Sequence, residues 1–114
     1  MTDRCKLWIE EVELLAHARR VYLAFLASPA GVERAATERA VLEADQRLDG
    51  AVLLEWELRP EVDAVLLRAL AHTRQSVEAD LERNGVPAEH LAQYAKERRS
   101  AIDRLTAKLR KNVS

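Results

Sequence analysis

Residues 3–27, DRCKLWIEEVELLAHARRVYLAFLA, are the stretch that decides the fold. Wound as an α-helix at about 100° per residue, this stretch carries apolar side chains over roughly two-thirds of its circumference. An ordinary surface helix has an apolar stripe only ~100° wide. One apolar direction is formed by Leu7, Leu14, Val21 and Phe25. A second direction is formed by Ile9, Val12 and Leu23. We therefore expect a helix over residues 3–27 that is covered on several sides.

The two apolar directions of this helix predict a homodimer. One set of side chains can face the chain's own core, but the other set would then expose a larger apolar patch than monomers usually carry. A two-fold dimer buries such a patch against its own copy. The candidate dimer or partner surface consists of Leu7, Leu14, Val21 and Phe25. The alternative is a monomer in which this helix is central and touches all the other segments.

The composition predicts a single all-α domain spanning residues 1–114. Only three glycines and three prolines interrupt a chain rich in good helix formers, and the charged fraction of 32% is balanced by 48% apolar residues. The single cysteine, Cys5, cannot form an intrachain disulfide. No run approaches the ~20 apolar residues of a membrane span. We expect a cytoplasmic protein that does not interact with a membrane.

A second helix is expected to begin between Ser28 and Val32. Its inner face should carry Val41, Ala44 and Leu48, whereas Glu38, Asp45 and Asp49 should lie on the opposite, polar face. The pair Asp49-Gly50 is a turn signal and marks a reversal of the chain.

Residues 51–59 allow two interpretations. Val52, Leu54, Trp56 and Leu58 alternate with other residues, as in a strand, but the sequence offers no convincing partner strand. Ala51, Leu54, Leu58, Val62 and Val65 instead follow helical spacing straight across Pro60. We therefore favour a third, long helix that is kinked or broken near Pro60, with the strand as the alternative.

After Pro60 the pattern is regular. The inward residues of the third helix are Val62, Val65, Leu66, Ala69, Leu70, Thr73, Val77 and Leu81. Gly85 stands where a helix ends in the left-handed conformation, and Val86 can contact Leu81 in a Schellman motif. Pro87 opens a last helix, whose inner face carries Leu91, Tyr94, Ala95, Ala101, Ile102, Leu105 and Leu109. These assignments give a bundle of about four helical segments.

The sequence predicts no catalytic residue, metal site or cofactor. His17, His72 and His90 lie on different helices, and neither Glu-x-x-His nor His-x-x-x-His occurs. Five charged residues occupy positions where apolar ones are expected: Glu11, Arg19, Glu55, Asp80 and Arg98. Such residues either extend their charged ends to water or form buried ion pairs or a site.

The last helix is basic. Residues 96–111 contain seven basic and two acidic side chains, a net charge of +5, although the whole chain has −1. Such asymmetry can mark a surface for polyanions. The candidate polyanion surface consists of Arg99, Arg104, Lys108 and Lys111.

Residues 87–105, PAEHLAQYAKERRSAIDRL, resemble the helix-turn-helix of DNA-binding proteins. Ile102 and Leu105 match its buried positions, and the resemblance implies that Arg104 lies on a recognition helix. However, Lys96-Glu97 stands where that motif has glycine and a small apolar residue, and this pair favours one unbroken helix.

From the sequence we therefore expect a non-catalytic, regulatory module for protein–protein interaction, such as an adaptor or an immunity-like partner. Its partner is a protein or a second copy of itself. A nucleic-acid-binding regulator that uses the basic last helix is the alternative.

Overall fold

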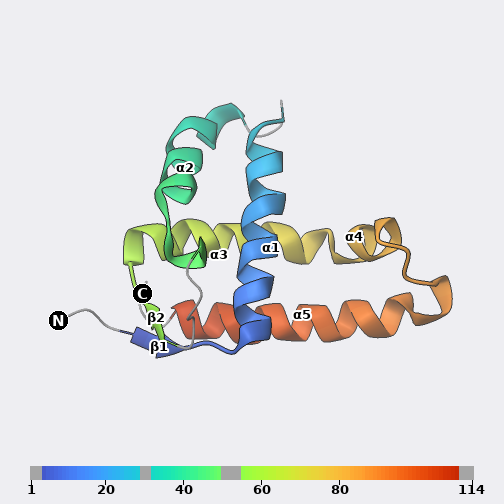
Figure 1. The fold of residues 1–114 in the computed structure, drawn as a ribbon. Coiled ribbons are helices and arrows are strands. Elements are labelled where there is room, and N and C mark those ends of the chain that lie inside the picture. The colour runs from blue at the N-terminus through green and yellow to red at the C-terminus, as the bar shows by residue number, and fades with distance from the viewer. Residues whose placement is uncertain (1–3, 29–31, 50–54, 111–114) are drawn as a thin grey trace.

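The computed structural model describes residues 4–28, 32–49 and 55–110 (Figure 1). In chain order, its elements are β1 (Arg4–Lys6), α1 (Ile9–Leu26), α2 (Val32–Ala44), the 3₁₀ turn η2 (Arg47–Asp49), β2 (Glu55–Glu57), α3 (Pro60–Gln75), α4 (Val77–Arg83) and α5 (Ala88–Arg110). The all-α prediction is confirmed. The described residues form five α-helices rather than about four, with a two-stranded ribbon beside them.

Helix α1 is central to the molecule. Helices α3 and α4 follow one another, α5 returns beside them, and α1 crosses this pair with α2 along its upper half (Figure 1). The largest fully buried side chains come from the five α-helices, from β2 and from Leu7 ahead of α1: Trp56, Leu7, Leu15, Leu26, Leu42, Leu66, Leu70, Ile102, Leu105, Leu109, Val77 and Thr73. The broad apolar arc of α1 is thus largely covered by other segments of the same chain, as the monomeric alternative requires.

Helix α1 begins at Ile9, six residues later than residue 3. The N–H of Trp8 donates to Glu11 Oε1 at 3.0 Å, and this bond satisfies one of the amides that every helix start leaves without an intrahelical acceptor. The preceding residues are extended and form β1. The helical prediction for residues 4–8 was wrong because the 3.6-residue pattern also accommodates Cys5 and Leu7.

The helical prediction for residues 51–59 was also wrong where the structure describes it. Glu55–Glu57 forms β2, which pairs antiparallel with β1 in the register Arg4↔Glu57, Cys5↔Trp56 and Lys6↔Glu55. The partner strand was therefore present inside the stretch assigned to the first helix. The long-helix interpretation of residues 51–54, and the reversal at Gly50, lie outside the described residues.

Pro60 is the first residue of α3 rather than a kink within a longer helix. Proline is favoured at a first helical position, and Asp63 Oδ2 accepts the Arg59 N–H at 3.0 Å. The interruption lies at Ser76, between α3 and α4.

The predicted helix stop at Gly85 is confirmed. Gly85 has a φ of 88°, its N–H donates to the Glu82 carbonyl at 3.0 Å, and the Val86 N–H donates to the Leu81 carbonyl at 3.0 Å. These two bonds define a Schellman motif.

The inner face predicted for α2 was wrong. Glu38, Leu42 and Asp45 are buried, whereas Ala44 is exposed and Val41 is half-buried. The two acidic side chains are tolerated inside because each has a charged partner. Glu38 accepts from the Tyr22 hydroxyl at 2.5 Å and from Arg68 Nε at 3.1 Å, so it joins α2 to both α1 and α3.

Candidate functional site

A polar cleft runs along one side of α1, where this helix crosses α3, α4 and α5. Its larger part is a cavity of about 560 Å³, which we call the His17 cleft. It is lined by His17, Arg20, Val21, Ala24, Phe25, His72, Ser76, Asp80 and Arg83. A smaller hollow of about 340 Å³, lined by Glu10, Glu13, Leu14, His17, Arg98 and Ala101, adjoins it at His17.

His17 stands at the junction of these two hollows. Its Nε2 atom is buried and has no hydrogen-bond partner among the described residues, and it lies 4.0 Å from Asp80 Oδ2. Burial and the positive charge of Arg98 lower the pKa of His17 below its ordinary value of 6.5, Arg20 adds to the effect, and Asp80 opposes it. His17 is therefore neutral at pH 7.

Asp80 lies at the base of the cleft. Its Oδ2 is 3.3 Å from the Ser76 hydroxyl, and its Oδ1 is 3.4 Å from Arg83 Nη1. The Ser76 hydroxyl also lies within reach of the His72 and Thr73 carbonyls, at 3.5 and 3.3 Å. In a catalytic triad the imidazole stands between the serine and the carboxylate, whereas here the carboxylate stands between Ser76 and His17.

The opposite wall of the cleft is apolar and aromatic. The ring centroids of Phe25 and His72 lie 4.4 Å apart with the ring planes tilted by 34°, and the Tyr22 ring is stacked on Phe25 at 5.8 Å. His72 is half-buried and takes part in these ring contacts. The cleft therefore combines an apolar wall with a cationic and imidazole-rich mouth.

A second charged cluster is buried around Arg47. Its guanidinium donates to both carboxylate oxygens of Asp45, at 2.8 and 3.2 Å, and to the Glu57 carbonyl at 2.6 Å. It also lies 2.9 Å from Asp63 Oδ1, without the alignment of a hydrogen bond, and 4.2 Å above the Trp56 ring. Burial lowers the pKa of Arg47, but the two aspartates raise it above its ordinary value. The cluster joins η2, β2 and α3.

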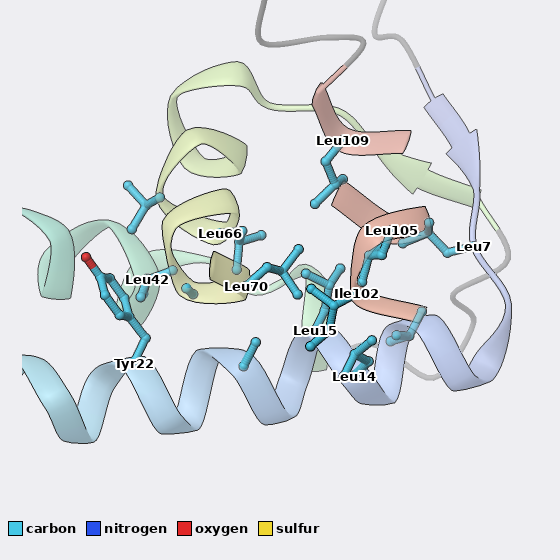
Figure 2. Close-up of a cluster of buried hydrophobic side chains, with 14 of the residues drawn as sticks. Leu7, Leu14, Leu15, Tyr22, Leu42, Leu66, Leu70, Ile102, Leu105 and Leu109 are labelled. Carbon is cyan, nitrogen blue, oxygen red and sulfur yellow. The ribbon is translucent and has the colours of Figure 1, made fainter. Parts of the chain in front are cut away.

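The four residues predicted as a dimer surface do not form one exposed face. Leu7 and Leu14 are only 1% and 8% exposed, and Figure 2 shows them directed at Ile102 and Leu105 of α5. Val21 and Phe25 are half-buried in the wall of the His17 cleft. Leu14, Val21 and Phe25 lie on α1 as predicted, whereas Leu7 precedes this helix, and the fold buries Leu7 and Leu14.

The exposed apolar residues lie elsewhere. Among the described large apolar residues, Trp8 and Ile9 are the most exposed, at 68% and 65%, followed by Tyr94 at 43%. Beside Trp8 lies a hollow of about 470 Å³, lined by Trp8, Glu10, Glu11, Leu14, Ala101, Arg104 and Lys108. We call Trp8, Ile9 and this hollow the Trp8 surface. The sequence pattern did not reveal this surface, because Trp8 and Ile9 fall within the apolar arc of the longer helix predicted over residues 3–27.

The predicted polyanion residues are partly engaged within the fold. Arg99 Nη2 lies 3.1 Å from Glu78 Oε1, and Lys108 Nζ lies 2.6 Å from Glu11 Oε1. Arg104 is exposed, and Lys111 lies outside the described residues. Helix α5 continues without interruption through Lys96 and Glu97, so the turn of the helix-turn-helix resemblance is not formed.

Three of the five charged residues at apolar positions join elements or cap them. Glu11 caps α1 and pairs with α5, Arg19 donates to the Asp45 carbonyl at 3.0 Å, and Asp80 bonds Ser76. The other two lie nearer the surface. Glu55 pairs with Arg4 across the ribbon, and Arg98 is half-buried beside His17.

Cys5 is half-buried, and burial, followed by the negative charge of Asp63, raises the pKa of its thiol. Within residues 4–28, 32–49 and 55–110 there is no group of three or more His, Cys, Asp or Glu side chains placed to hold a metal ion. None of the helices in these ranges is long and apolar enough to cross a membrane. Comparisons with protein-family models, curated proteins and solved structures found no match to this chain.

Proposed function

We propose that this protein is a small, non-catalytic helical module for protein–protein interaction, and that it forms a homodimer through the Trp8 surface. The observation that carries the proposal is the pair of consecutive large apolar side chains, Trp8 and Ile9, that project into solvent at the start of α1. A tryptophan beside a hollow is a typical centre of a protein interface. Exposed tryptophans are costly, and burial against a partner removes that cost.

The charges around Trp8 favour a second copy of the chain as the partner. The hollow is lined by two acidic side chains, Glu10 and Glu11, and two basic ones, Arg104 and Lys108. In a two-fold interface each patch meets a copy of itself, so a patch of one sign would repel its partner. This patch is neutral overall and can place the acidic side of one copy against the basic side of the other.

The proposal that the protein is not an enzyme is supported by the state of its nucleophile candidates. The pKa of the Cys5 thiol is raised, which lowers its thiolate fraction. The Ser76 hydroxyl is bonded to carbonyl and carboxylate oxygens rather than to an imidazole. We also propose that the module is cytoplasmic, because a protein with a single cysteine forms no intrachain disulfide and needs no oxidising compartment.

Nucleic-acid binding by α5 remains the alternative, with less support. Lys108 and Arg99 have acidic neighbours within ion-pair distance, so a phosphate backbone would compete with Glu11 and Glu78 for them. If duplex DNA did bind, its affinity would fall steeply with salt.

Light scattering on a size-exclusion column tests the dimer. The wild-type protein should elute with twice the mass of the chain, whereas Trp8→Glu should be a folded monomer with unchanged helical circular dichroism. Tyr94→Glu is the matched control, because Tyr94 is also an exposed aromatic residue but lies on α5 outside the Trp8 surface. A wild-type monomer at high protein concentration would contradict the dimer, as would a Trp8→Glu variant that remains dimeric.

A further inference from the structure

We propose that the His17 cleft binds a small organic anion, in which a carboxylate or phosphate group is joined to an apolar, ring-sized body. This cleft lies along α1 from its middle to its C-terminal end, whereas Trp8 precedes the helix, and the proposal does not depend on the dimer. Its cavity of about 560 Å³ falls within the roughly 300–1,000 Å³ that small-molecule sites occupy.

The charges at the mouth of the cleft select an anion. Arg20 and Arg83 are exposed there, and the single acidic side chain of the lining, Asp80, is buried beneath them. Arg20, Arg83 and Asp80 therefore give the lining one positive charge in excess. The Arg83–Asp80 contact is long, at 3.4 Å, and Arg83 is solvent-exposed, so its guanidinium can turn to a ligand at little cost.

The position of Asp80 determines where the charged group of the ligand lies. Asp80 is turned toward Ser76 and away from solvent, so an anion would be held between the two arginines and would not contact this carboxylate. A cationic amine in the cleft would be repelled by Arg20 and Arg83.

The apolar wall provides for the body of the ligand. Val21, Ala24 and Phe25 lie on one side of α1 and face the cleft, and the centroid of the Phe25 ring lies 4.4 Å from that of the His72 ring. A flat ring can pack against this pair, as aromatic groups do in most small-molecule sites.

His17 supplies a polar atom for which such a ligand would be the hydrogen-bond partner. Its Nε2 is buried without a hydrogen-bond partner among the described residues, and buried polar atoms are rarely left in this state. A ligand oxygen beside Nε2 would accept a hydrogen bond from it.

The protonation of His17 predicts a pH dependence of ligand affinity, which is a second test of the proposal. His17 faces Arg20 and Glu13 on its own helix, His72 on α3, Asp80 on α4 and Arg98 on α5. In the free protein burial and Arg98 lower the pKa of His17, whereas a bound anion would favour the charged imidazolium. Binding should therefore take up a proton, and the affinity should rise as the pH falls from about 8 to about 6.

Isothermal titration of the full chain with four probes of one body tests the site: benzoate, phenyl phosphate, benzylamine and benzyl alcohol. The two anions should bind, and the amine and the alcohol should bind at least about tenfold more weakly, which is the loss of one charge-assisted contact. Benzoate stays ionised between pH 6 and 8, so its pH dependence reports the protein. Benzylamine or benzyl alcohol binding as tightly as the anions would overturn the proposal.

Three variants locate the site. Arg20→Gln should weaken benzoate binding about tenfold, and His17→Gln should weaken it and remove most of the pH dependence. Arg74→Gln is the control, because Arg74 is an exposed arginine paired with Asp103 outside the cleft, and its affinity should stay within about twofold of the wild type. Equal losses in Arg20→Gln and Arg74→Gln, or an unchanged pH dependence in His17→Gln, would contradict the assignment.

Discussion

At the scale of single residues, buried charges hold this protein together where its elements are short. Arg47 is the clearest case, since it contacts Asp45, Asp63, the Glu57 carbonyl and the Trp56 ring. These contacts join η2, β2 and the start of α3. A guanidinium with five donors in a rigid fork can bind all three at once, which a lysine cannot.

The replacement Arg47→Met should destabilise the protein by about 3–5 kcal/mol, because it leaves Asp45 and Asp63 buried without a counter-charge. The free energy of unfolding in urea measures this loss. Arg4→Met is the control: Arg4 pairs with Glu55 at the surface, and its loss should cost less than about 1 kcal/mol.

Charge, rather than packing, should account for most of this loss. Adding Asp45→Asn and Asp63→Asn to the Arg47→Met protein removes both orphaned carboxylates and should recover part of the stability. If the triple variant is no more stable than Arg47→Met, the loss comes from packing against Trp56.

At the scale of elements, the sequence predicted those parts that follow one regular period. The inner faces predicted for α3 and α5 agree with the structure at Leu66, Leu70, Ile102 and Leu105, because each stripe recurs every three or four residues. Tyr94 is an exception, since it was predicted on the inner face of α5 and is 43% exposed. The α2 face could not be found in this way. Its buried Glu38 and Asp45 are polar, and their partners Arg68 and Arg47 become neighbours only in the folded chain.

The two-stranded ribbon was missed for a different reason. Three residues are too few for a period to be visible, and Cys5 fits a helix as well as a strand. The alternation of charge was an available signal: Arg4 and Lys6 flank Cys5, and Glu55 and Glu57 flank Trp56, so opposite charges meet on the outer face. The His17 cleft had no local signal, since it lies where α1 meets α3 and α4, which are distant from α1 in sequence.

The α4–α5 connection provides a test at this scale. Gly85 has a φ of 88°, and a Cβ placed on it would meet no heavy atom within 4 Å. Gly85→Ala should therefore destabilise the protein by about 1 kcal/mol through backbone strain alone. Gly85→Asn should cost less, because asparagine adopts this conformation more readily. Thermal unfolding of the two variants measures the difference. Equal melting temperatures for Gly85→Ala and the wild type would contradict the prediction that alanine strains the backbone at this position.

At the scale of the whole molecule, α1 determines the architecture because every large element is packed on it. The ribbon and α5 lie at its N-terminal end, α3 crosses its middle, and α2 covers its C-terminal half (Figure 1). A helix with so broad an apolar arc was compatible with a dimer seam or with a central position in one chain. Which of the two arrangements forms depends on where the other helices pack, and the periodicity of α1 alone does not predict this.

The same substitution at two positions of α1 separates the core from the exposed surface. Leu14 is 8% exposed and points at Ile102 of α5, so Leu14→Glu buries a charge without a partner and should unfold the chain. Ile9 is 65% exposed in the first turn of the same helix, where a negative charge is favourable, so Ile9→Glu should remain folded. Far-ultraviolet circular dichroism and urea unfolding compare the two proteins directly. A folded Leu14→Glu protein would place Leu14 on the surface and restore the seam first predicted for it, whereas an unfolded Ile9→Glu protein would show that Ile9 is already buried in the molecule. The expected outcome, one variant lost and the other intact, leaves Trp8 and Ile9 as the part of α1 available to a second copy.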